Sequence, residues 1–189
     1  MLARFCRESW LVLVSSLVFG LLVSWVYGQL QGPIEQNARN KLNREMGLLL
    51  GEGSTFEPVA DDKGQVLYYK GVKGGQVKGY AFKAVGGGFA DKIELLVAVD
   101  AECKTLLGMA VLKTNETPGF GDKMKDDQFK GQFNGCPAPD KQNKLAVLKT
   151  GDRSKVDREI VAITGATITS EAVTKIVNNA VIAMRERIK

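Results

Sequence analysis

Residues 163–170 combine four hydroxyl side chains with the local pattern of a phosphate-binding turn. The segment reads Ile-Thr-Gly-Ala-Thr-Ile-Thr-Ser, follows a short apolar run and leads into a helical pattern. The free amides and the positive dipole end of a helix start point at any anion held there. The simpler interpretation is that the hydroxyls only cap the helix, although capping requires one hydroxyl and the segment offers four.

The helix that follows this turn is the clearest element in the sequence. We expect Ser170 as its N-cap, Glu171 in its first turn and basic residues in its last turn, where each charge suits the helix dipole. A continuous apolar stripe predicts the buried face, consisting of Ala172, Val173, Ile176, Val177, Ala180, Val181 and Met184.

Short strand candidates occupy the middle of the chain. Their residues are rich in β-branched and aromatic side chains and are separated by Gly or Asp; they cover 66–70, 77–85, 93–99 and 106–112, with shorter ones at 145–150 and 160–163. Residues 122–133 are compatible with one short helix. Strands followed by a terminal helix indicate a compact α+β domain with a small sheet.

The N-terminal segment has the composition of a membrane anchor. Residues 9–32 carry no charge, and a spanning helix needs about 20 apolar residues. Trp10, Trp25 and Tyr27 lie where interfacial aromatics are expected. A cleaved signal peptide is the alternative, but the bulky residues that end the apolar run do not resemble a cleavage site.

These patterns divide the chain into three parts. Residues 1–32 form a short tail and the anchor, residues 33–53 a stalk helix, and residues 54–189 the folded domain. Positive charges flank both ends of the anchor and do not decide its orientation. Because the large part lies downstream and long domains translocate regardless of charge, we expect the domain outside the cytoplasm.

Composition excludes several classes of function. The chain has no histidine, which removes the commonest general base and metal ligand, and its three cysteines are too few for a zinc or iron–sulfur site. We therefore assign no catalytic residue and no metal ligand. The net charge of +5 is spread along the chain and argues against nucleic-acid binding. A mildly basic surface suits the neighbourhood of a membrane.

Two motifs together resemble one known family. Thr164-Gly165-Ala166-Thr167, followed by Ile168-Thr169-Ser170, is similar to the Ser/Thr-Gly-Ala-Thr motif of the FMN-binding domain family. Glu116-Thr117-Pro118-Gly119-Phe120-Gly121 resembles that family's Glu-Thr-Pro-Gly-Leu-Gly loop, which lies beside the flavin; alone, its Pro-Gly pair would indicate only a turn.

The resemblance implies a covalent cofactor. It implies that Thr167 is joined to FMN through a phosphoester bond, which a flavin transferase makes with FAD as donor. The remaining site residues that it implies are Thr164, Gly165, Ala166, Thr169, Ser170, Glu116, Thr117, Pro118 and Gly119.

The family includes the G subunit of the Rnf electron-transport complex and the C subunit of the sodium-translocating NADH:quinone oxidoreductase, and the compact length here is closer to the former. The resemblance thus implies a single-pass subunit of the cell inner membrane, with its domain on the periplasmic side and other redox and membrane subunits as partners. It would carry electrons in a complex that couples ferredoxin:NAD electron transfer to ion translocation, without being catalytic alone. The alternatives are the quinone-reductase subunit, a stand-alone extracytoplasmic flavoprotein, or an anchored binding module without cofactor.

The sequence departs from the family pattern at two places. The family often has an Asp three or four residues before the first Ser/Thr of the motif, where this chain has Val161 and Ile160, and a His two residues before the loop Glu, where it has Thr114.

Two further hypotheses remain open. The triple glycine at 86–88 predicts close backbone approach to the ring or a flexible hairpin end. Cys103 and Cys136 would suit a disulfide in an oxidising compartment.

Overall fold

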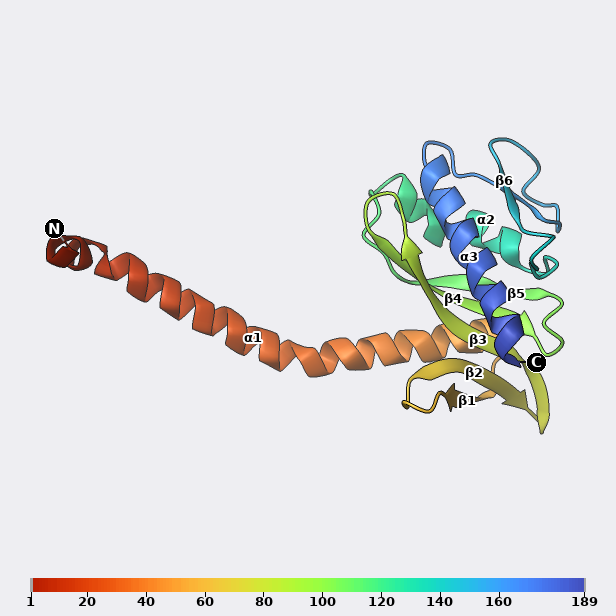
Figure 1. The fold of residues 1–189 in the computed structure, drawn as a ribbon, viewed down its shortest axis with the longest axis horizontal. Coiled ribbons are helices and arrows are strands. Elements are labelled where there is room, and N and C mark those ends of the chain that lie inside the picture. Colours follow the sequence, from red (N-terminus) through yellow and green to blue (C-terminus); the bar gives the residue numbers. More distant parts are fainter. Residues whose placement is uncertain (1, 189) are drawn as a thin grey trace. The chain divides into compact units, whose positions relative to one another are not determined.

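The computed structural model describes the backbone of residues 2–188 and the side chains of residues 9–188 (Figure 1). Cys6, which the sequence places before the anchor, has its side chain outside the described residues. Packing separates two compact units, one ending at Lys41 and the other beginning at Leu42. Helix α1 (Leu2–Leu50) contributes to both units, and each unit is described by itself.

Helix α1 is long and apolar enough to cross a membrane. Over Ser9–Leu50 its most apolar 18-residue window has a mean hydropathy of 2.1 and no buried residue. The predicted anchor and the predicted stalk helix are both helical within this one element. The helix ends at Leu50, before Gly51 with its φ of 96°, because glycine reaches that left-handed conformation without a steric penalty.

The folded unit is built on an antiparallel five-stranded sheet in the order β1-β2-β3-β4-β5. Its strands are β1 (Thr55–Ala60), β2 (Val66–Lys73), β3 (Gln76–Gly87), β4 (Lys92–Asp100) and β5 (Leu106–Lys113). The four long predicted strands are confirmed. Strand β1 was not predicted, because it is a largely exposed edge strand that contains Pro58 and lacks a clear apolar alternation.

Helices cover both faces of this sheet. Helix α3 (Thr167–Ile188) packs on one face, where Val173 and Val177 meet a core that includes Phe82, Leu95 and Val97. On the other face, the last turns of α1 pack Leu42, Met46 and Leu50 against Ala81, Leu96 and Ala98. Alternate residues of β4 therefore enter different cores, as the two-residue period of a strand requires. The predicted α+β class is confirmed.

The connection between β5 and α3 differs from the prediction. Instead of one helix over residues 122–133, three short helical segments follow one another: η1 (Gly121–Lys125), α2 (Asp127–Lys130) and η2 (Gly131–Phe133). Asp126 is extended, with φ −71° and ψ 143°, and so interrupts the helix. Two parallel strands complete the connection, β6 (Ala146–Leu148) and β7 (Glu159–Val161), both shorter than predicted.

Candidate functional site

The two motif segments, which lie far apart in the sequence, meet around one cavity of about 500 Å³. The loop after β5 forms one wall, the start of α3 forms another, and the residue that follows the triple glycine closes the rim. The lining residues are Phe89, Glu116, Thr117, Phe120, Gly121, Gly165, Ala166, Thr167, Ile168 and Thr169. Thr164, Ser170, Pro118 and Gly119, which the resemblance also implied, are not among these lining residues.

Helix α3 begins four residues earlier than the sequence suggested, since an N-cap at Ser170 would make Glu171 its first residue. Its first residue is Thr167, so the prediction of Ser170 as N-cap was wrong. The buried Ser170 hydroxyl instead donates a 2.9 Å hydrogen bond to the Ala166 carbonyl and accepts one of 3.0 Å from the Ile163 amide. These two bonds fix the turn before the helix, and the first amides of α3 are left for a ligand because helix starts have no intrahelical acceptor for them.

The four hydroxyls of the motif occupy different environments. Thr169 is buried and donates a 2.7 Å hydrogen bond to Glu116. The Ser170 hydroxyl is already hydrogen-bonded to the backbone of the turn before α3. Thr164 is exposed and lines a separate cavity of about 230 Å³. Thr167 is half-buried and lines the main cavity, and no described residue forms a hydrogen bond with its hydroxyl. Among these four hydroxyls, Thr167 is therefore the one that lines the main cavity without a hydrogen bond to the protein.

Glu116 joins three segments of the site. Its side chain is 4% exposed and accepts hydrogen bonds from the Thr169 hydroxyl (2.7 Å) and from the amides of Ala90 (2.9 Å) and Asp91 (3.3 Å). Burial by itself raises the pKa of this carboxyl, but the hydrogen bonds from Thr169 and from the 89–91 backbone together lower the pKa below its ordinary value. The site thus contains a buried carboxylate that stays ionised.

Two glycines leave room for this carboxylate. A Cβ at Gly88 would collide with Glu116 Oε1, and a Cβ at Gly121 would lie 2.8 Å from Glu116 Oε2 and 3.0 Å from Thr169 Oγ1. At Gly86, a Cβ would collide with Ile176 of α3. The triple glycine therefore brings backbone close to Glu116 and α3. Gly119 and Gly165 have φ values of 78° and 81°, so both turns of the motifs use the left-handed conformation.

Large apolar side chains surround the mouth of the cavity. Phe89, Phe120 and Ile168 are 64%, 54% and 57% exposed. The resemblance placed the 116–121 loop beside the flavin but did not single out Phe120 or Gly121, and it did not assign Ile168 to the site. No local pattern shows that Phe120 and Ile168 stay exposed. Apolar walls, a helix start and an available hydroxyl suit a ligand that joins a flat aromatic ring to a phosphate, and the volume is within the usual range for small-molecule sites.

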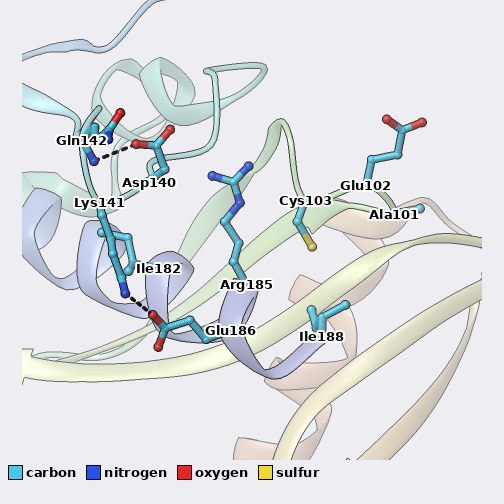
Figure 2. Close-up of a pocket in the computed structure, with 10 residues that line it drawn as sticks. All are labelled: Ala101, Glu102, Cys103, Asp140, Lys141, Gln142, Ile182, Arg185, Glu186 and Ile188. Carbon is cyan, nitrogen blue, oxygen red and sulfur yellow. Dashed lines mark hydrogen bonds and ion pairs between the residues drawn. The ribbon is translucent and has the colours of Figure 1, made fainter.

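A second cavity, of about 550 Å³, lies near the C-terminal end of α3 and contains none of the motif residues (Figure 2). Cys103, Arg185 and the Lys141–Glu186 ion pair of 2.7 Å line it. Cys103 and Cys136 are both free and buried, and no disulfide joins them. Burial raises the pKa of both thiols, that of Cys136 to about 11, so neither is a reactive thiolate at neutral pH.

The chain is similar to subunits of two ion-translocating complexes. The chain is 33% identical over 177 residues to the G subunit of the ion-translocating oxidoreductase complex of Methanosarcina acetivorans, and the match covers 90% of this chain and 89% of the relative. It is 33% identical over 169 residues to the G subunit of the proton-translocating ferredoxin:NAD(+) oxidoreductase complex of Clostridium ljungdahlii, covering 89% of this chain and 85% of the relative.

The fold also has a solved counterpart. The crystal structure of the C subunit of the Na(+)-translocating NADH-quinone reductase from Parabacteroides distasonis superposes with a TM-score of 0.55 at 23% identity, covering 65% of this chain and 62% of that chain. Finally, the family model of the FMN-binding domain matches residues 88–182, which contain both motifs and all the residues that line the cavity. The chain belongs to the FMN-binding domain family.

Proposed function

We propose that Thr167 carries FMN through a phosphoester bond and that the chain is an electron-carrier subunit of a membrane complex. The observation that carries the covalent assignment is the availability of the Thr167 hydroxyl in the cavity, while Thr169 and Ser170 are occupied by internal hydrogen bonds. The names of the two relatives support a complex that couples ferredoxin:NAD electron transfer to ion translocation.

The attachment step needs FAD and a flavin transferase as partner. The Thr167 oxygen forms a bond to the phosphorus that carries the FMN portion, the phosphoanhydride bond of FAD breaks, AMP leaves and the hydroxyl proton is released. The start of α3 favours this position for a phosphate, because its free amides and positive dipole end stabilise negative charge.

The remaining residues of the cavity position the cofactor. Once attached, FMN supplies the electron-accepting and electron-donating chemistry, which no side chain of this protein provides. Phe89 and Phe120 offer apolar surface to a flat ring, and Glu116 keeps the loop, the β3–β4 turn and α3 in one arrangement. Gly165, Ala166 and Thr117 complete the wall around Thr167.

We also propose that α1 anchors the protein in the cytoplasmic membrane with the folded unit on the extracytoplasmic side. The length and apolar character of α1 support the anchor. A covalent tether has a physical advantage outside the cytoplasm, because dissociated FMN would be lost there by dilution.

The test is the intact mass of the full-length protein after co-expression with a flavin transferase. We expect the wild type to carry the added mass of FMN, to fluoresce after denaturation and to yield a modified peptide that contains Thr167. Thr167→Ala should lose both signals. Thr164→Ala is the matched control and should retain them, since Thr164 is exposed and lines a different cavity. A fluorescent Thr167→Ala protein, or a modification mapped to Thr169 or Ser170, would contradict the assignment.

A further inference from the structure

Strand β3 extends beyond the strand that pairs with one of its sides. Strand β2 pairs with β3 only from Lys73↔Gln76 to Tyr69↔Ala81, whereas β4 stays paired with β3 as far as Gly87↔Lys92. Figure 1 shows β3 continuing past β1 and β2. Residues 82–87 are therefore paired with a strand on one side only, because residues 66–68 of β2 continue past the last pair without pairing with β3.

The open side of this segment presents backbone hydrogen-bonding groups. In an antiparallel strand, alternate residues direct their N–H and C=O groups away from a given neighbour, here away from β4. The pairing of β2 with β3 ends at Tyr69↔Ala81, and no residue from 82 to 87 has a paired partner in β2. An edge of this kind is a template for one more strand.

A cavity of about 610 Å³ follows the same edge. All six residues from 82 to 87 line it, together with Leu67 of β2 and residues of α3. Successive residues of a strand point to opposite faces, so a cavity that touches each of them runs along the strand edge rather than beneath one face. On the α3 side, the small side chains of Ala172, Ala180 and Ala183 leave the space open.

The charge of this groove selects for an acidic occupant. The charged residues that line it are Lys83, Lys175 and Arg187, all basic. Lys83 has one acidic neighbour, Glu94 at 3.9 Å, and its side chain is 47% exposed, so that pair is weak. A second copy of the same edge would bring basic residues against basic residues, which disfavours self-pairing.

We propose that residues 82–87 and the adjoining face of α3 bind an extended, acidic segment of another subunit as an additional β-strand. Main-chain hydrogen bonds would provide affinity, and the three basic side chains would provide selectivity. The groove ends at Gly87, and Phe89, two residues further on, lines the cofactor cavity. The bound segment would therefore reach the edge of the FMN site. The proposal rests on the proposed membership of a complex and does not require the flavin.

Hydrogen–deuterium exchange on the detergent-purified complex, compared with the purified full-length chain alone, tests this proposal. Amides of residues 82–87 should exchange at least about tenfold more slowly in the complex, whereas those of the exposed edge strand β1 should not change. The double variant Lys83→Glu/Lys175→Glu should lose this protection or the subunit's place in the complex. Lys78→Glu is the control and should behave as wild type, because Lys78 is exposed and lies at the bulge in the half of β3 that pairs with β2.

Three results would overturn the proposal: equal exchange in the complex and in the free chain, protection that survives the double charge reversal, or protection of the chain alone that increases with its concentration. The last result would identify a second copy as the occupant. The same measurement on Thr167→Ala separates the two proposals, because a flavin-free chain that still shows protection leaves the groove assignment intact when the cofactor assignment fails.

Discussion

The Thr169 hydroxyl donates a 2.7 Å hydrogen bond to Glu116 Oε2, which joins two residues 53 positions apart. Each residue belongs to one of the two motifs that the sequence presents separately. Because the same carboxylate also accepts the Ala90 and Asp91 amides, this buried contact connects all three walls of the cavity. It also removes Thr169 from the hydroxyls available for attachment.

Glu116→Gln should destabilise the folded unit at pH 7. The substitution keeps the shape but replaces a charged acceptor of several hydrogen bonds, at an expected loss of about 2 kcal/mol. The folded-state pKa of Glu116 lies below its ordinary value of 4.5, so its stabilisation is complete above that value and is lost as pH falls through the folded-state pKa. Urea denaturation of both full-length proteins in detergent should show that the difference in free energy of unfolding between wild type and Glu116→Gln narrows below pH 4.5.

The exposed Glu57 on β1 provides the control for this experiment. Glu57→Gln should leave the free energy of unfolding close to wild type across the same pH range. If Glu116→Gln were equally harmless, the carboxylate would not be the group that connects the three walls.

Thr169→Val should mainly lower the stability of the protein, whereas Thr167→Ala should mainly remove the flavin. Thr169→Val removes the donor to a buried carboxylate and should cost about 1–2 kcal/mol, with the pKa of Glu116 moving back up. Thr167→Ala should change the stability of the flavin-free protein by less than about 0.5 kcal/mol and abolish attachment. Denaturation curves and denatured-state fluorescence measured on the same samples test both. A strongly destabilised Thr167→Ala protein would contradict the free-hydroxyl interpretation.

Gly88→Ala and Gly121→Ala should each destabilise the fold, by about 1–3 kcal/mol as for other overpacked sites. The new methyl group would push into the Glu116 carboxylate in both cases. Gly87→Ala is the matched control, because a Cβ there meets nothing within 4 Å. Thermal unfolding of the three variants should separate the first two from the third, and similar melting temperatures for all three would exclude this packing.

Orientation across the membrane can be tested with a membrane-impermeant maleimide. Lys63→Cys places an accessible thiol in the exposed turn between β1 and β2, while Cys103 and Cys136 are 7% and 0% exposed and contribute little background. With the folded unit outside the cytoplasm, intact cells should label the new cysteine, and Cys6 should react only after permeabilisation. The reverse labelling order would place the folded unit in the cytoplasm.

Much of the architecture could be predicted because its signals are local. The runs of β-branched and aromatic residues in β2–β5, the apolar stripe of α3 and the uncharged run in α1 each occupy one continuous segment. Prediction failed where the conformation of a segment depended on its neighbours in the fold. Strand β1 is defined by pairing with β2, and the 122–133 segment is broken at Asp126. Ser170 stabilises the turn before α3 and is not its N-cap.

The sequence by itself determined that a hydroxyl-rich turn precedes a helix and that a Glu-Thr-Pro-Gly loop exists elsewhere in the chain. Only the tertiary structure decided which hydroxyl is available. Thr167 and Thr169 are the same residue type, but residues two apart in the sequence of an α-helix point in directions about 200° apart. Glu116 meets only the second, through a contact that exists because β5 and α3 fold together. The open edge of β3 likewise depends on where β2 stops pairing, which is a property of the sheet and not of any single strand.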